Sequence, residues 1–275
     1  MRLIIQPDYL SLSQWTAAYI ARKILDYGPT AQKPFVLGLP TGSSPIGTYQ
    51  ELVRLHKKKL ISFRNVVTFN MDEYVGIPEA HPQSYHSFMR KHLFGHIDIP
   101  ADQVNILNGN AKNLEKECAT YEARIKEMGG IDLFLGGVGP DGHIAFNEPG
   151  SSLHSRTRIK TLTYDTILAN SRFFDNDVKK VPRLALTVGV ETVTDARQVV
   201  LIVSGHAKSR ALQKVIEEGV NHMWTASVLQ LHPKSIMVCD EESTVELKVG
   251  TYRYFKDIEA KNRAPLKLAA NARRK

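Results

Sequence analysis

The residues best suited to chemistry stand in one run, Gly139-Pro140-Asp141-Gly142-His143-Ile144-Ala145-Phe146-Asn147-Glu148. His143 lies between the carboxylates of Asp141 and Glu148, after a glycine-rich turn. A carboxylate bonded to one ring nitrogen fixes the tautomer and leaves the other nitrogen to exchange a proton. An Asp-x-His spacing also suits a metal site, and a purely structural turn is a third interpretation. The only other histidine or cysteine nearby in the sequence is His154, which argues against a metal.

Asp72 is a second candidate for acid–base work, in the run Asn70-Met71-Asp72-Glu73-Tyr74. It follows an apolar strand-like run directly, so its carboxylate is expected to be partly desolvated. Desolvation raises the proton affinity of a carboxylate toward that of a useful base. The alternative is an aspartate that caps or turns the chain.

A phosphate-binding loop is predicted at Pro40–Ser44, where Gly42, Ser43 and Ser44 precede a helix. Glycine lets the backbone approach a ligand closely, and hydroxyls beside a helix N-terminus favour a phosphate. Lys208, just after a strand and a Gly-His turn, can supply a point charge to the same anion. An ordinary helix start and a solvated lysine are the alternatives. The spacing fits neither a P-loop nor the dinucleotide glycine fingerprint, so no nucleotide cofactor is implied.

The elements that must position these residues alternate between strand and helix patterns. A first strand is predicted at Met1–Gln6, and further strands at Phe35–Leu39, Val66–Met71, Ile131–Leu135, Leu184–Val188, Val199–Val203 and Ile236–Cys239. Amphipathic helices are predicted at Leu12–Tyr27, Ser44–Lys59, Leu114–Met128, Ala207–Glu218 and Thr244–Glu259. In the second of these helices we expect Ser44 as N-cap and Pro45 in the first turn. The alternation predicts a Rossmann-like α/β fold: an open, mostly parallel sheet with helices on both faces.

The candidate residues fall repeatedly where predicted strands end. Ligands of open α/β sheets bind beyond the carboxyl ends of the strands. The runs at 40–44, 70–74, 136–143 and 204–208 each follow such a strand. A phosphate grip, an acid–base histidine and a carboxylate base together suit the movement of a carbonyl between neighbouring carbons of a sugar phosphate. Nothing in that task requires a metal or an organic cofactor.

The remaining composition sets the broad class. The chain has 275 residues, of which 43% are hydrophobic and 23% charged, as in an ordinary globular protein. We expect one α/β domain over residues 1–260, with a polar lid insertion at about 151–183 and a basic tail at 261–275. The tail holds six of the basic residues and no acid, so the net charge of +8 falls to 8 − 6 = +2 for the body. The basicity therefore does not predict a nucleic-acid surface.

Location and redox state follow from the same composition. No apolar run is long enough to span a bilayer, and the N-terminus lacks the features of a secretory signal, so a cytoplasmic protein without membrane contact is expected. The two cysteines, Cys118 and Cys239, form no disulfide framework or spaced zinc site. Both are expected to be reduced and structural.

Several runs resemble the hallmarks of the glucosamine-6-phosphate deaminase family. They are Pro40–Ser43, Val67–Tyr74, Gly139–Gly150, Ser155–Thr161, Ala169–Phe174 and Leu184–Gly189. The resemblance extends from the first strand to about Glu259. Ser43-Ser44 stands where many relatives have glycine and threonine, a change that keeps hydroxyl and backbone donors.

The resemblance implies a division of labour at the site. Asp72 is similar to the base that takes the C2 proton and returns it at C1. His143 resembles the group that opens the pyranose ring, with Asp141 and Glu148 as its carboxylate partners. For the phosphate it implies Gly42, Ser43, Ser44, Arg172 and Lys208. The implied products are fructose 6-phosphate and ammonia, formed without a cofactor.

The resemblance also implies regulation. It implies an allosteric site for N-acetylglucosamine 6-phosphate, in which Arg158 and Lys160 hold the effector phosphate. Its residues are Ser151, Ser152, Arg158, Lys160, Thr161 and Tyr254. Allosteric members of the family are homohexamers, so a homohexamer is expected here.

Two other functions compete. A 6-phosphogluconolactonase shares the fold and a similar Gly-x-Gly-x-Asp-Gly-His turn, but its run differs after the histidine and it needs no C2 base. A sugar-phosphate-sensing regulator would carry a helix-turn-helix segment, which the sequence does not contain.

Overall fold

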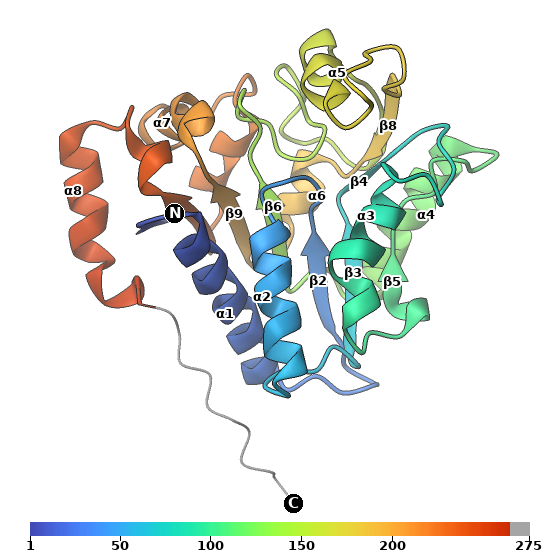
Figure 1. The fold of residues 1–275 in the computed structure, drawn as a ribbon, viewed down its shortest axis with the longest axis horizontal. Helices are drawn as coiled ribbons and strands as arrows, with labels where there is room; N and C mark the ends of the chain where they lie inside the picture. The colour runs from blue at the N-terminus through green and yellow to red at the C-terminus, as the bar shows by residue number, and fades with distance from the viewer. Residues whose placement is uncertain (265–275) are drawn as a thin grey trace, which may run out of the picture.

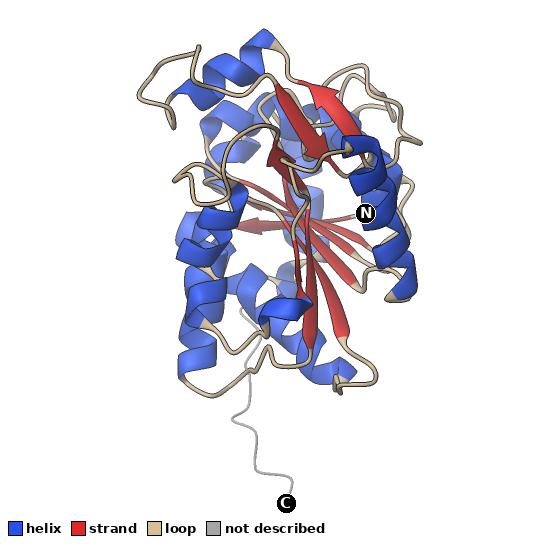
Figure 2. Ribbon diagram, turned by 90° about the vertical axis from the view of Figure 1, so that its right-hand side faces the viewer, coloured by secondary structure: helices blue, strands red, loops and turns tan. Residues whose placement is uncertain are grey.

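A parallel seven-stranded sheet forms the centre of the molecule, described by a computed structural model over residues 1–264. The strand order is β1-β10-β9-β6-β2-β3-β5, and every neighbouring pair is parallel. The strands are β1 (Arg2–Gln6), β2 (Phe35–Leu39), β3 (Val66–Asn70), β5 (Val104–Asn105), β6 (Leu133–Gly137), β9 (Val199–Val203) and β10 (Ser235–Asp240). Most are continuously buried, because helices cover both faces (Figure 2).

The helices divide the core into two layers, one on each side of this sheet. On one face α1 (Tyr9–Tyr27), α2 (Ile46–Lys57) and α3 (Tyr85–His92) pack against β-strand residues such as Leu37. On the other face α4 (Leu114–Glu127) and α7 (Ser209–Glu217) pack against residues such as Phe134. Successive strand residues point to opposite faces, so each strand contributes to both layers. The remaining helices are α5 (Tyr164–Ser171), α6 (Val190–Thr194) and α8 (Val249–Ile258).

A second, antiparallel sheet begins directly after the carboxyl end of β3. Its order is β4-β8-β7, with β4 (Asp72–Tyr74), β8 (Leu184–Thr187) and β7 (Arg158–Thr161). A small apolar cluster that includes Tyr74, Phe146 and Leu162 packs against it. In Figure 1, β8 and α5 lie together at the top of the molecule. The predicted lid segment is thus a folded layer with its own strand and helix.

The predicted α/β fold is confirmed, with local corrections. Leu184–Val188 was expected among the strands of the main alternation, but β8 belongs to the antiparallel sheet because it pairs with β4 and β7. The predicted strand Ile131–Leu135 begins two residues later and ends at Gly137. The predicted helix Thr244–Glu259 starts only at Val249, because a 3-10 turn capped by Asp240 precedes it.

The start of α2 also differs from the prediction. Its N-cap position is Pro45, and no side chain caps it. The hydroxyl of Ser44 is engaged elsewhere, because it accepts a hydrogen bond from Lys208 Nζ at 2.8 Å. Ser44 therefore interacts with Lys208 at the carboxyl ends of the strands and does not cap the helix.

The last described residues pack on the first elements of the chain. Trp15 Nε1 donates to the carbonyl of Asn262 at 2.7 Å, and Gln6 Nε2 donates to the carbonyl of Arg263 at 2.8 Å. Arg2 forms a bidentate pair with Glu259 at 2.8 and 2.7 Å. The first residues of the predicted tail are thus docked, and its positions 265–275 lie outside the described residues. Within residues 1–264, no helix is long and apolar enough to cross a membrane.

Candidate active site

The predicted phosphate residues meet at one corner of the sheet. Lys208 Nζ reaches across from the end of β9 to the Ser44 hydroxyl beside β2. Burial and the charge of Arg172 lower the pKa of Lys208 to about 8, against a smaller opposing effect of Asp240. A desolvated cation beside a second cation is stabilised by an incoming anion. The structure therefore pairs Lys208 with Ser44. Arg172 is exposed, with its guanidinium group 4.7 Å from the centroid of the Phe173 ring, and acts on Lys208 through its charge.

The phosphate loop itself is held by a side chain that the sequence did not single out. The hydroxyl of Tyr9, on α1, accepts a hydrogen bond from the Gly47 backbone at 2.8 Å. The same hydroxyl lies 3.2 Å from the Ser43 carbonyl and 3.0 Å from the Ser44 carbonyl. Gly42 has a φ of 90°, which a side chain rarely adopts. Tyr9 is 38 residues from Gly47, so no local pattern signals this contact.

Asp240 is a second residue that sequence analysis missed. Its carboxylate accepts from the Ser204 hydroxyl at 2.5 Å, and from the Gly205 and Ser243 backbones at 3.0 Å. Gly205 has a φ of 86°, and this turn leads directly to Lys208. Asp240 follows an apolar strand, which is the pattern that identified Asp72. The same pattern, applied to β10, would have found it.

Asp72 lies buried at the junction of β3 and β4, with 6% of its surface exposed. Within the described residues its Oδ1 has no hydrogen-bond partner. Burial, followed by the negative charge of Glu73, raises the pKa of this carboxylate well above its usual value. A buried carboxylate with a raised pKa and an open oxygen is suited to taking a proton from a ligand.

Tyrosines surround Asp72 from several elements. Tyr49 of α2, Tyr85 of α3 and Tyr121 of α4 each have a pKa raised well above the usual value. Burial is the main cause in each case, and the charge of Asp72 contributes. Their hydroxyls therefore stay protonated and donate hydrogen bonds at neutral pH.

The turn at 139–143 brings His143 and Asp141 into contact. His143 Nδ1 lies 2.5 Å from Asp141 Oδ1. Burial raises and the contact with His143 lowers the pKa of Asp141, and the net effect is a lowered value. A Cβ on Gly139 would come within 2.4 Å of the imidazole ring, so this position requires glycine. The contact leaves Nε2 of His143 as the nitrogen that can face a substrate.

Glu148 does not join this pair. It is 1% exposed, and its carboxylate accepts from the Thr163 backbone at 2.9 Å and from the Thr163 hydroxyl at 3.0 Å. Among the ion pairs of the described residues, His143 has Asp141 as its only partner. Thr163 is the N-cap of α5. These donors satisfy Glu148, which in this structure ties the turn after His143 to the start of α5.

The predicted effector residues lie mostly on β7 and on the segment that leads into it. Lys160 Nζ donates to the buried Ser151 hydroxyl at 3.3 Å. Arg158 Nη1 donates to Asn147 Oδ1 at 2.8 Å, and burial lowers the pKa of its guanidinium group. Ser152 is exposed and accepts from the His154 backbone at 3.1 Å, and Thr161 is exposed at the end of β7.

Tyr254 is the exception among these residues. It lies on α8 with 58% of its surface exposed. In Figure 1, α8 and β8, the strand that pairs with β7, stand at opposite sides of the molecule. A single chain therefore does not bring Tyr254 to the other effector residues.

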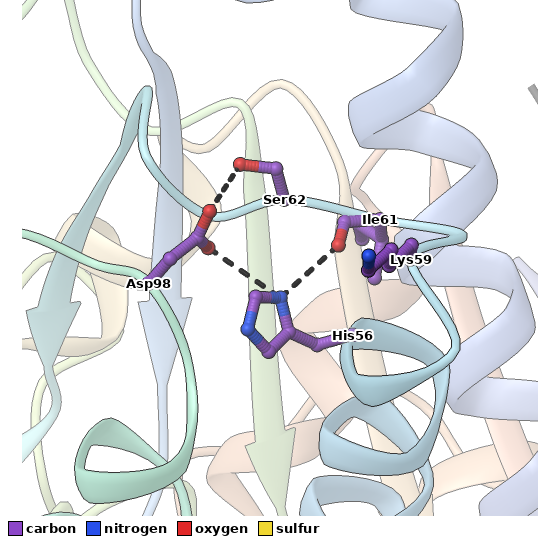
Figure 3. A pocket seen from close by; sticks show the side chains of 5 residues that line it. All are labelled: His56, Lys59, Ile61, Ser62 and Asp98. Carbon is purple, nitrogen blue, oxygen red and sulfur yellow. Dashed lines mark hydrogen bonds and ion pairs between the residues drawn. The ribbon is translucent and has the colours of Figure 1, made fainter.

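A hollow of about 210 Å³ lies at the amino ends of strands β3 and β5, away from the carboxyl ends where the predicted site residues lie. It is lined by His56, Lys59, Ile61, Ser62 and Asp98, between the end of α2 and the segments that enter β3 and β5 (Figure 3). No three or more His, Cys, Asp or Glu residues of the described chain are grouped so as to hold a metal ion. Both cysteines are buried and free.

Comparison with known proteins gives consistent matches over nearly the whole chain. The family model for glucosamine-6-phosphate isomerases/6-phosphogluconolactonase matches residues 7–238. A glucosamine-6-phosphate deaminase of Parabacteroides distasonis is 66% identical over 268 residues, covering 98% of this chain and 99% of the relative. One of Borreliella burgdorferi is 64% identical over 262 residues, covering 95% of this chain and 98% of the relative.

Solved structures give the same picture. A monomeric glucosamine-6-phosphate deaminase superposes with a TM-score of 0.85 at 40% identity, covering 88% of this chain and 98% of that chain. A 6-phosphogluconolactonase from Trypanosoma cruzi has a TM-score of 0.69 at 21% identity, covering 90% of this chain and 97% of that chain. The second similarity concerns the fold alone.

Proposed function

Because the chain belongs to the family of glucosamine-6-phosphate isomerases and 6-phosphogluconolactonases, as an enzyme of the glucosamine-6-phosphate deaminase type, we propose that it converts glucosamine 6-phosphate and water into fructose 6-phosphate and ammonia. The observation that carries the proposed reaction is Asp72, a buried carboxylate with a free oxygen beside the phosphate corner. A C2 base is needed for isomerisation and not for lactone hydrolysis.

Substrate binding would begin with the phosphate. Lys208 and Arg172 supply two positive charges, and Ser44 and the backbone of Gly42 and Ser43 supply donors. Charge-assisted hydrogen bonds to a phosphate are among the stronger polar contacts. Holding C6 in this way orients the sugar toward Asp72 and His143.

Ring opening is assigned to His143. Asp141 holds one ring nitrogen at 2.5 Å, so the other nitrogen can pass a proton between the anomeric hydroxyl and the ring oxygen. The product of this step is the open-chain aldehyde, in which the C2 proton is acidified by the neighbouring carbonyl.

Isomerisation is assigned to Asp72. Its carboxylate removes the proton from C2, whose electron pair forms the C1–C2 double bond of an enolamine while the C1 carbonyl pair moves to O1, which takes a proton from the substrate ammonium group. The Asp72 carboxyl then returns a proton to C1, and the nitrogen lone pair forms the C2 imine. The resulting C2 imine adds one water and breaks the C–N bond, which releases ammonia and fructose 6-phosphate. The raised pKa of Asp72 favours holding the proton between these two transfers.

We propose in addition that N-acetylglucosamine 6-phosphate activates the enzyme at the Ser151–Thr161 segment. Arg158 and Lys160 place two cations there, with Ser151 and Ser152 as hydroxyl donors. The hydrogen bond from Arg158 to Asn147 supports coupling, because Asn147 precedes Glu148 in the catalytic turn. An effector phosphate would compete for Arg158 and so act on that turn.

The assembly belongs to the same proposal. A homohexamer in the cytoplasm would allow Tyr254 to reach the effector segment of a neighbouring copy, which one chain does not allow. The relative of known structure at 40% identity is monomeric, so size measurement of this protein is the direct test.

Ammonia release from glucosamine 6-phosphate tests the reaction. We expect turnover in the presence of a chelator, and faster turnover at low substrate when N-acetylglucosamine 6-phosphate is added. No ammonia with or without the effector would refute the deaminase reaction. Hydrolysis of 6-phosphogluconolactone, measured in parallel, would instead support the lactonase alternative.

A further inference from the structure

Glu73 follows the proposed base on β4 and points to the opposite side of the strand. It is 3% exposed, and its carboxylate accepts from the Tyr74 backbone at 2.8 Å. It also accepts from the Tyr85 backbone at 3.0 Å and from the His86 backbone at 3.2 Å. His86 Nδ1 lies 2.7 Å from the same carboxylate. A buried carboxylate that accepts this many hydrogen bonds is held in one position.

These contacts account for the first turn of α3. The first N–H groups of a helix lack partners within it. Glu73 accepts from Tyr85 and His86, and Ser84, the N-cap, accepts from Ser87 at 3.0 Å. A negative charge at this end also interacts favourably with the helix dipole. The start of α3 is therefore tied to the strand that carries Asp72.

The tie matters for the site because Tyr85 begins this helix. Its ring is stacked on that of Phe146, with centroids 6.2 Å apart. The rings of Tyr74 and Tyr85 have centroids 5.0 Å apart. Tyr85 thus joins the start of α3 to the strand of the base.

We propose that Glu73 is a positioning residue of this site: its carboxylate fixes the first turn of α3 against β4 and thereby holds the Tyr85 ring against Tyr74, on the strand that carries Asp72. The inference rests on the proposed function, because it gives Glu73 a part in the reaction that Asp72 begins. Glu73 itself has no contact with the phosphate corner and takes no proton from substrate.

Glu73 also influences the base electrostatically. It is the charged group that, after burial, raises the pKa of Asp72. The other titratable groups that face Asp72 are Tyr49, Tyr74, Tyr85 and Tyr121, whose raised pKa values keep them neutral. The groups that face Glu73 are His86 and, through Nε2 of that ring at 3.8 Å, Glu79.

The test separates charge from position with Glu73→Gln and Glu73→Asp. E73Q keeps an acceptor for the backbone donors but removes the charge beside Asp72. We expect its kcat to fall and the acid limb of its kcat/KM profile to move to lower pH by roughly half to one unit. E73D keeps the charge but shortens the reach, so kcat should fall at least about tenfold with the acid limb in place. An unshifted acid limb in E73Q, or wild-type kcat in E73D, overturns the proposal.

A matched control is Asp98→Asn. Asp98 also accepts from a backbone N–H, that of Phe63 at 2.6 Å, and lies 3.5 Å from a histidine nitrogen, His56 Nδ1. It lines the hollow that Figure 3 shows, whose lining includes no residue of the proposed site. D98N should therefore leave kcat and the pH profile unchanged. Thermal unfolding of all three variants checks that each is folded.

A measurement without substrate keeps this inference distinct from the proposed reaction. Carboxyl carbon NMR of the free protein reports the titration of Asp72, assigned by its disappearance in D72N. The midpoint should fall in E73Q and stay in D98N and E73D. An unchanged midpoint in E73Q overturns the electrostatic part even if the protein releases no ammonia.

Discussion

The two ends of the strands of the central sheet carry polar side chains in opposite states. At the amino end, beside the hollow, Asp98 is half-buried and accepts from the Ser62 hydroxyl and the Phe63 backbone, each at 2.6 Å. At the carboxyl end, the buried Asp72 has an oxygen without a hydrogen-bond partner among the described residues, and Lys208 has a pKa lowered to about 8. Buried polar groups are normally satisfied by the protein, so the exceptions need another explanation.

This difference shows that a cavity by itself does not indicate a binding site. The hollow at His56 has a volume of about 210 Å³, yet the carboxylate that lines it already has protein donors. At the carboxyl end, the open oxygen of Asp72 and the charge of Lys208 are available to a ligand. These two groups, rather than a cavity volume, support placing the proposed site there.

Between the two ends of the sheet, the largest expected difference is the loss of activity when one carboxylate is removed. Asp72→Asn should lower kcat by about 10²- to 10⁴-fold, because it removes the proposed general base. KM should change little, and exchange of the C2 proton with solvent should stop. Asp98→Asn should keep nearly full activity. Steady-state ammonia release and proton exchange followed by NMR measure both, and persistent exchange in D72N would remove Asp72 from this role.

A second contrast compares two lysines. Lys208→Ala should raise KM roughly 10- to 100-fold, because one charge-assisted contact to the phosphate is lost. Lys59→Ala, at the hollow, should leave KM unchanged. Equal effects of the two substitutions would show that Lys208 acts only through the overall charge of the protein.

The pH dependence of KM sharpens the same comparison. Lys208 is protonated below its pKa of about 8, and only that form attracts the phosphate. Above pH 8 we expect KM to rise by about tenfold for each pH unit, since binding must then recover a proton. The rise should be absent in K208A. A wild-type KM that is flat from pH 7 to about 9.5 would contradict a lowered pKa at this lysine.

The smallest effect is expected at the support of the phosphate loop. Tyr9→Phe removes the hydroxyl that binds Gly47, so KM should rise by about two- to tenfold with kcat nearly unchanged. Tyr27→Phe, at the other end of α1, is the matched control. A fall in kcat without a change in KM would place the role of Tyr9 elsewhere.

The residues that sequence analysis identified share one property: their chemical role can be inferred from a few neighbouring residues in the sequence. Asp72 follows a strand, and His143 stands two residues from the Asp141 that holds it. The resemblance also suggested Glu148 as a partner of His143, but proximity in sequence did not decide its contacts. Its carboxylate goes to Thr163, fifteen positions along the chain.

The residues that sequence analysis missed act through tertiary contacts. Tyr9 holds a loop from another helix, and Asp240 holds a turn 35 residues away. Glu73 lay inside a run that the analysis had singled out, but its meaning depends on where α3 begins. The parallel sheet was predictable because buried strands are continuous apolar runs. The second sheet was not, since β4 and β7 are short and polar.

The placement of the first strand has a consequence for synthesis of the protein. β1 is an edge strand of the sheet, and its one partner strand within residues 1–264 is β10, with Arg2 opposite Ile236. On the ribosome, the first strand emerges more than 200 residues before the strand that must receive it. The turn before Lys208 is also completed late in synthesis, because Asp240, which supports this turn, is the last residue of β10. The nascent chain therefore completes the proposed site only when nearly all of it has been made.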